Sequence, residues 1–151
     1  MIDRFERFSI AIAEISRYWH KIAAEELERY GLKGPHAIYL TTMYQYPDGI
    51  TATRLTELCG RDKSDVSRMM TIMEQKGLVL RDGINNYRAL LQLSDTGREA
   101  AEHIRSRAAT AVAIAGRDLS DETRAVFYEG LESIARNLRD ISRDGLPAED
   151  A

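Results

Sequence analysis

The sequence predicts a mainly α-helical chain with one small β-hairpin, and three observations support this fold class. Apolar residues recur every three or four positions over long stretches, which is the period of an amphipathic helix. Only 3 prolines and 10 glycines occur among 151 residues, too few for a chain built from many strands and turns. Two short runs, 78–81 and 88–93, read as strands, and the stretch between them is rich in turn formers.

The first expected element is a long helix from about Asp3 to Tyr30 that stops at Gly31. Its apolar residues are spaced 3, 4, 3, 4 and 3 positions apart: Phe5, Phe8, Ile12, Ile15, Trp19 and Ile22. This spacing is close to the 3.5-residue repeat of a helix–helix contact. Because the helix would run for about seven turns, we expect a partner helix from this chain or from another copy.

Three shorter helices are expected next. Gly34-Pro35 starts the first, because proline is preformed for the first helical turn. Thr51 can cap the second, and a turn at 59–62 leads into the third, which Asp62 can cap and Gly77 ends. The inner face of the third helix is expected to consist of Val66, Met69, Met70 and Met73.

Two helices are expected after the hairpin. Ser94 or Asp95 can cap the first, which runs from about Thr96 to Ala115. Ser120 can cap the second, whose apolar residues step by 4, 3, 4 and 3 positions through Phe127, Leu131, Ile134, Leu138 and Ile141. This last helix, like the first, therefore carries an apolar face that a partner helix could cover.

The order helix, four-residue turn, helix, hairpin is that of a winged helix-turn-helix. We therefore expect a winged helix-turn-helix module at 34–95, and a helical dimerisation lobe formed by 1–33 together with 96–145. In such a module the second helix of the pair enters the major groove of DNA. Its inner side must be apolar, and its outer side must carry short polar or cationic side chains.

The outer side of the expected recognition helix has this composition. Ser64, Ser67 and Thr71 are small enough to let the backbone approach a major groove about 12 Å wide. Lys63 and Arg68 can reach phosphates or a guanine edge. We therefore expect these five side chains to contact DNA.

The hairpin adds two cations, Arg81 and Arg88, which could contact phosphates or the minor groove. From Arg61 to Arg88 six cations accompany four anions, a net charge of +2, whereas the whole chain carries −3. The acidic total excludes a uniformly basic nucleic-acid coat protein and leaves a local basic patch as the DNA-facing surface. Ordinary edge-strand charge is the alternative explanation for the two hairpin arginines.

Four stretches of the central module resemble a known family. They run from Asp62 to Arg68, from Glu74 to Val79, over Arg81-Asp82, and from Arg88 to Gly97. They look like the recognition helix, the wing and the start of the following helix in MarR-type transcriptional regulators. Where that family's wing commonly carries Asp-Arg-Arg, this chain has Asn86-Tyr87-Arg88, so Asn86 joins Arg88 among the expected DNA-binding residues.

The resemblance implies a homodimer that binds double-stranded DNA at a pseudo-palindromic operator, with its two recognition helices in successive major grooves. It also implies repression by occlusion, relieved by a small effector. The family often binds phenolic or other aromatic anions between the first helices and the recognition module. The residues expected to line such a pocket are Trp19, His36, Tyr39 and Met43, and ordinary core packing is the alternative for them.

Two other functions fit the same fold. One is a winged-helix adaptor that binds protein, and the other is a zinc-responsive repressor. For zinc, His36 and His103 could approach each other, but a tetrahedral set would also need glutamates such as Glu25, Glu99 or Glu102. Because no pair of His or Cys residues has the spacing of a zinc site, we expect no metal and no cofactor.

Enzymatic activity has no support, because the chain lacks a nucleophile motif, a phosphate-binding glycine loop and a paired-carboxylate signature. The single cysteine, Cys59, cannot form an internal disulfide and is expected to be a small buried apolar residue. No apolar run approaches the roughly 20 residues needed to span a bilayer, and the charged N-terminal stretch does not resemble a signal peptide. We therefore expect a cytoplasmic protein without a membrane partner.

Overall fold

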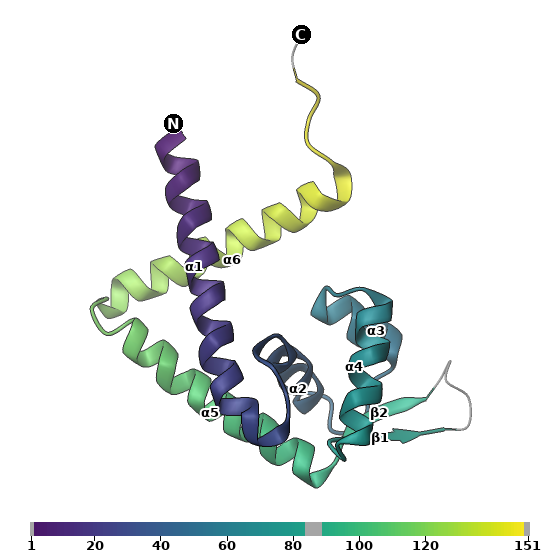
Figure 1. Cartoon of the computed structure of the whole chain (residues 1–151). Coiled ribbons are helices and arrows are strands. Elements are labelled where there is room, and N and C mark those ends of the chain that lie inside the picture. The colour runs from purple at the N-terminus through teal and green to yellow at the C-terminus, as the bar shows by residue number, and fades with distance from the viewer. Residues whose placement is uncertain (1, 84–88, 150–151) are drawn as a thin grey trace. The chain divides into compact units, whose positions relative to one another are not determined.

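The computed structural model describes residues 2–83 and 89–149, and these form a mainly helical chain with one small sheet (Figure 1). The elements are α1 (Ile2–Leu27), two short 3-10 helices η1 (Glu28–Tyr30) and η2 (Gly34–His36), α2 (Ala37–Tyr44), α3 (Ala52–Cys59), α4 (Lys63–Gln75), β1 (Val79–Asp82), β2 (Leu90–Leu93), α5 (Asp95–Ala115) and α6 (Asp121–Asp144). The expected fold class is confirmed. Asn86 and Arg88 lie outside the described residues.

The chain divides into two compact units, Met1–Ala109 and Thr110–Ala151. In the first unit, α1 ends one turn earlier than the sequence pattern predicts. Its last turn tightens into η1, and Gly31 stops it with a φ of 69° that glycine adopts without strain. The predicted stop at Gly31 is therefore confirmed, with a 3-10 turn in front of it.

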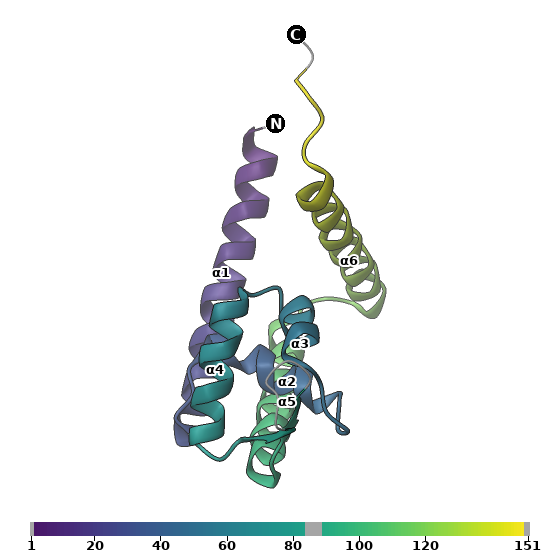
Figure 2. The same cartoon turned by 90° about the vertical axis from the view of Figure 1, so that its right-hand side faces the viewer.

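The core of this unit lies around α2, α3 and α4 (Figure 2). Its largest fully buried side chains include Tyr39, Leu40, Met43, Leu55 and Met73. The helix α1 adds Ala23 and Leu27 from its C-terminal part. Its N-terminal part leaves apolar side chains in solvent, with Phe5 71% and Ile15 60% exposed.

The ends of α3 and α4 explain how the helix-turn-helix is placed. The Thr51 hydroxyl accepts a hydrogen bond from the Arg54 backbone N–H at 3.2 Å, so the predicted cap of α3 is confirmed. The predicted cap of α4 is wrong in one respect. Asp62 occupies the N-cap position, but its side chain makes no capping hydrogen bond. Only its backbone carbonyl bonds into the helix, accepting from the Val66 N–H at 3.0 Å.

The end of α4 directs the chain into the sheet. Gly77 has a φ of 72°, its N–H bonds to the Glu74 carbonyl at 3.0 Å, and the Leu78 N–H bonds to the Met73 carbonyl at 2.9 Å. This is the Schellman motif, and it confirms the predicted stop. Because Leu78 completes that motif, β1 begins at Val79 and not at the predicted residue 78.

The two strands pair antiparallel, with Val79 opposite Leu93 and Asp82 opposite Leu90. A bridge between Ile50 and Leu91 joins the segment before α3 to the same sheet. The second strand was predicted from residue 88; the described part of the chain shows it from Leu90. The sheet thus lies directly beside the C-terminal end of α4.

In the second unit, α6 begins where predicted, because the Ser120 hydroxyl accepts from the Thr123 backbone N–H at 3.1 Å. No residue of α6 is buried. Its apolar stripe is open to solvent, with Phe127 45%, Ile134 42% and Leu138 51% exposed. Among the described residues, no helix has the length and apolar character needed to cross a membrane.

Candidate nucleic-acid interface

The helix α4 separates its side chains into two faces. The inner face packs into the core, with Val66, Met69, Met70 and Met73 all buried. All five residues that the sequence predicts to contact DNA from this helix are exposed: Lys63, Ser64, Ser67, Arg68 and Thr71. The apolar inner side holds the helix on the module, so the polar side is presented to solvent.

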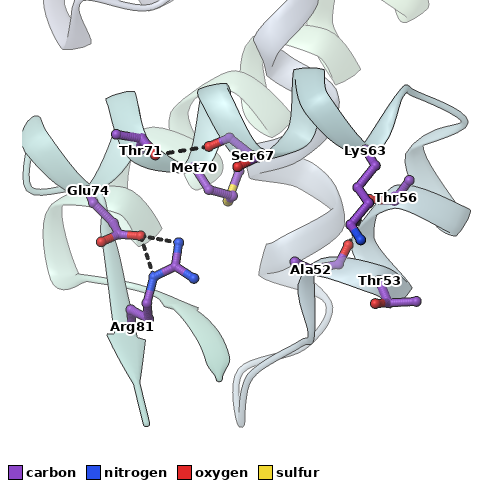
Figure 3. Close-up of a pocket in the computed structure, with 9 residues that line it drawn as sticks. All are labelled: Ala52, Thr53, Thr56, Lys63, Ser67, Met70, Thr71, Glu74 and Arg81. Atoms are coloured by element: carbon purple, nitrogen blue, oxygen red, sulfur yellow. Dashed lines mark hydrogen bonds and ion pairs between the residues drawn. The ribbon is translucent and has the colours of Figure 1, made fainter. Parts of the chain in front are cut away.

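A groove of about 570 Å³ runs along this face between α3, α4 and β1 (Figure 3). Its walls are formed by Ala52, Thr53, Thr56, Lys63, Ser67, Met70, Thr71, Glu74 and Arg81. Four of the residues predicted to contact DNA therefore share one groove, namely Lys63, Ser67, Thr71 and Arg81. Ser64 and Arg68 are exposed on the same helix but do not line it.

Two threonines of α3 line the groove although the sequence analysis did not predict them as DNA contacts. Thr53 and Thr56 extend from α3 into the groove opposite α4. The Thr56 hydroxyl donates to the Ala52 carbonyl at 2.8 Å, as the Thr71 hydroxyl donates to the Ser67 carbonyl at 3.0 Å. Thr53 and Thr56 are three residues apart, which puts both on one side of α3. That spacing is the signal that could have identified them.

Arg81 has a partner inside the protein. Its guanidinium lies against Oε1 of Glu74, with Nε at 2.8 Å and Nη2 at 2.6 Å. Figure 3 shows this pair at the end of the groove, where it joins β1 to α4. The two side chains are only 26% and 32% exposed. Arg81 thus ties β1 to α4.

Asp65, near the start of α4, also has partners on two sides. The buried Tyr39 of α2 donates its hydroxyl to Oδ2 at 2.6 Å, and Arg68 approaches Oδ1 with Nη2 at 3.4 Å. The Tyr39 hydrogen bond, aided by Arg68 and Arg61, lowers the pKa of Asp65. Burial, followed by the Asp65 carboxylate, raises the pKa of Tyr39. Asp65 is therefore an ionised group anchored to the core.

The residues expected to line an effector pocket are not brought together around one cavity. Tyr39 and Met43 are each 1% exposed and belong to the core. The ring of His36 accepts a hydrogen bond at Nδ1 from the Lys33 backbone N–H at 3.2 Å, and burial lowers its pKa. Trp19 lines a cavity of about 260 Å³ whose other walls are His20, Gly34, Pro35, Ala37, Ile38, Thr41 and Arg61.

Cys59 and His103 have ordinary structural partners. Cys59 is 7% exposed, as predicted; it donates to the Thr42 hydroxyl at 3.7 Å, and burial raises its pKa. His103 of α5 lies 2.8 Å from Glu26 of α1, and Arg107 binds the other oxygen of that carboxylate at 2.8 Å. Within residues 2–83 and 89–149, no three His, Cys, Asp or Glu side chains converge to hold a metal ion.

These features define the class of fold. A short helix, a tight turn, a second helix with one apolar and one polar face, and an antiparallel hairpin beside it form a winged helix-turn-helix. The open outer face of the second helix is where proteins of this class meet the major groove.

Comparison with solved structures specifies the fold further. A MarR transcriptional regulator from Methanosarcina mazei Go1 matches with a TM-score of 0.79 and 22% identity, covering 90% of this chain and 92% of that one. A putative MarR family regulator from Listeria monocytogenes, complexed with 26mer DNA, matches at 0.78 and 20%, covering 93% and 96%. The MepR–DNA complex of S. aureus matches at 0.76 and 21%, covering 86% and 97%.

The chain therefore has the winged helix-turn-helix fold of the MarR-family transcriptional regulators. Scans against protein-family models and against curated proteins find no match. The resemblance noted in the sequence is thus confirmed at the level of the fold.

Proposed function

We propose that this protein is a sequence-specific transcriptional regulator that binds double-stranded DNA as a homodimer and represses by occlusion. The observation that carries this proposal is the outer face of α4, where short polar side chains and two cations are exposed beside an open groove. Two of the similar structures are complexes with DNA. They favour this function over a protein-binding adaptor. A zinc-responsive repressor is not favoured, because no three His, Cys, Asp or Glu side chains among the described residues could hold a metal ion.

The exposed side chains of α4 differ in length, and this suggests different contacts with DNA. Ser64, Ser67 and Thr71 are short and would let the helix backbone approach base edges, while Arg68 is long enough to reach a guanine. Lys63 stands at the first turn of α4, where its ammonium would meet a phosphate. Arg81, Asn86 and Arg88 complete the proposed set from the hairpin.

A second copy of this chain is the partner that the apolar faces of α1 and α6 would accept. Both stripes repeat with steps of three and four residues, and most members of both are exposed in the single chain. Such a repeat suits helix–helix contacts between copies. We therefore propose that 1–33 and 96–145 form a dimerisation lobe, separate from the DNA-binding module at 34–95. A two-fold dimer would present two recognition helices to a pseudo-palindromic operator.

We place a small aromatic anion in the cavity beside Trp19. Its volume of about 260 Å³ suits a ligand of one ring, Trp19 and Ile38 supply apolar walls, and Arg61 supplies a cation. Arg61 lies in the turn between α3 and α4. A ligand held there would change DNA affinity only if it binds the DNA-bound and unbound arrangements of α4 unequally.

The test is selection of duplexes from a random-sequence pool with the purified full chain, followed by a gel shift on the enriched duplex and on a scrambled version. We expect enrichment of a two-fold symmetric sequence and tighter binding to it than to the scrambled duplex. Binding to no duplex at low salt would overturn the proposal.

Sedimentation equilibrium of the free protein should give twice the 17.1 kDa chain mass.

A further inference from the structure

One carboxylate connects the core of the module to the exposed face of the recognition helix. Asp65 accepts from the Tyr39 hydroxyl through Oδ2 at 2.6 Å and lies 3.4 Å from Nη2 of Arg68 through Oδ1. Tyr39 is 1% exposed, whereas the Arg68 side chain is 75% exposed. The two oxygens of Asp65 therefore face in different directions, one toward the core and one toward the DNA-facing side.

The Tyr39 hydrogen bond restricts how this carboxylate can turn. A charge-assisted O–H···O bond of this length is among the stronger kinds in proteins. With Oδ2 fixed, Oδ1 has a defined position on the surface of α4. An exposed arginine otherwise samples many rotamers, and it loses that freedom when it binds a base. Because Asp65 offers Arg68 a fixed acceptor, the Arg68 side chain is already restricted in the free protein. It therefore loses less conformational entropy when DNA binds.

The guanidinium of Arg68 can be held by Asp65 and still read a base. It carries five N–H donors in a planar fork, and Asp65 engages one nitrogen. The other donors remain available for the O6 and N7 acceptors of a guanine in the major groove.

We propose that Asp65, fixed by the Tyr39 hydroxyl, is a positioning residue that orients Arg68 toward a guanine edge and so contributes to sequence specificity. This rests on the proposed DNA-binding function. It also explains why an anionic side chain stands on a helix that faces phosphates. Asp65 repels every DNA sequence alike, but it helps only a sequence that offers Arg68 a guanine.

The decisive variant is Asp65→Asn. Asparagine can still accept from Tyr39 through its carbonyl, but its amide then turns N–H donors toward Arg68. We expect affinity for the selected duplex to fall about five- to tenfold, the scale of one well-oriented arginine–guanine contact. Affinity for the scrambled duplex at low salt should rise about twofold, because one negative charge near the phosphates is gone. A loss of folding would lower both affinities.

Two further variants separate charge from position. Tyr39→Phe keeps the charge of Asp65 but removes the hydrogen bond that fixes its carboxylate. Binding to the selected duplex should therefore weaken, while binding to the scrambled duplex is unchanged. Asp62→Asn removes the same charge from the N-cap of α4, where the side chain makes no capping hydrogen bond. This matched control should not reduce the ratio of selected to scrambled affinity.

A double-mutant cycle with Arg68→Ala completes the test. In the Arg68→Ala background, Asp65→Asn should no longer reduce the affinity ratio. The proposal is overturned if Asp65→Asn reduces the ratio equally in both backgrounds, or leaves the ratio unchanged in the wild-type background. Failure of the unmodified protein to bind any duplex would instead reject the proposed function, and circular dichroism of each variant reports whether it is folded.

Discussion

Arg81 of β1 holds a single carboxylate oxygen of Glu74 in α4 with two guanidinium nitrogens, at 2.6 and 2.8 Å. The hairpin and the recognition helix are thus joined by a link of their own beside the groove (Figure 3). The placement of β1 relative to α4 therefore depends in part on this pair.

Glu74→Gln should lower the free energy of unfolding by about 1 kcal/mol, the upper range for an ion pair that is partly shielded from water. Urea titration measures the change. Glu57→Gln is the matched control, because Glu57 pairs with Arg54 at 3.1 Å but both side chains are more than half exposed. It should have a smaller effect. Equal losses in the two variants would show that the Glu74–Arg81 link is no stronger than a surface pair.

Lys63→Ala should weaken binding to the selected and the scrambled duplex by the same factor, because a phosphate contact carries no sequence information. The slope of log affinity against log salt should become shallower by about one. Gel shifts at four salt concentrations measure it. Lys21→Ala removes the same charge from α1 and should leave the slope unchanged. A change in the ratio between the two duplexes would show that Lys63 reads a base.

Trp19 is the only tryptophan, so its fluorescence reports directly on the cavity that it lines. Titration with salicylate, a one-ring aromatic anion, should change this fluorescence in a saturable way. Arg61→Ala should weaken that binding about tenfold, because a charged hydrogen bond to the carboxylate is lost. Arg54→Ala, on the neighbouring helix, is the control. Undiminished binding to Arg61→Ala would exclude Arg61 as the anion contact.

Leu138→Glu should convert the proposed dimer to a monomer, because it places a charge in the apolar stripe of α6, where Leu138 is 51% exposed in the single chain. Sedimentation equilibrium measures the mass. Arg136→Glu puts the same side chain on the opposite side of α6, since successive residues turn by about 100°. That variant should remain dimeric. A dimeric Leu138→Glu protein would show that this stripe is not the contact between copies.

The contact of α1 with α5 should respond to acid through Glu26. Hydrogen bonds from Arg107 and then His103 lower the pKa of Glu26 below its ordinary value of 4.5. A carboxyl with a lowered pKa stabilises the fold fully above that ordinary value, and its contribution disappears as the pH falls through the lowered pKa. Glu26→Gln should therefore be less stable than wild type at pH 7.

Urea unfolding of both proteins between pH 7 and pH 3 measures this difference. It should hold steady down to about pH 4.5 and shrink below it. Glu25→Gln, which removes the neighbouring exposed carboxyl of α1, is the control and should cost less stability at pH 7. A difference that grows as the pH falls would contradict the assignment.

The sequence alone determined the helices, most of their ends and the two-faced recognition helix. These features depend on neighbours within one or two turns, such as the Thr51 hydroxyl with the Arg54 N–H, or Gly77 after α4. Residue type alone misplaced two helix ends. Asp62 has the residue type of a cap but makes no side-chain capping bond. The Leu78 N–H completes the end of α4 by bonding to Met73, so the strand starts one residue later.

Only the tertiary structure decided which side chains meet across elements. Asp65 and Tyr39 are 26 residues apart. The sequence placed Arg81 on a strand, but it did not show that the guanidinium pairs with Glu74 of α4. The residues expected to line an effector pocket are also separated by tertiary packing. Tyr39 and Met43 are buried in the core, whereas Trp19 lines a cavity together with Arg61. Helical periodicity fixes the face on which a residue lies, but the orientation of its side chain depends on charges and hydrogen-bonding groups supplied by distant segments.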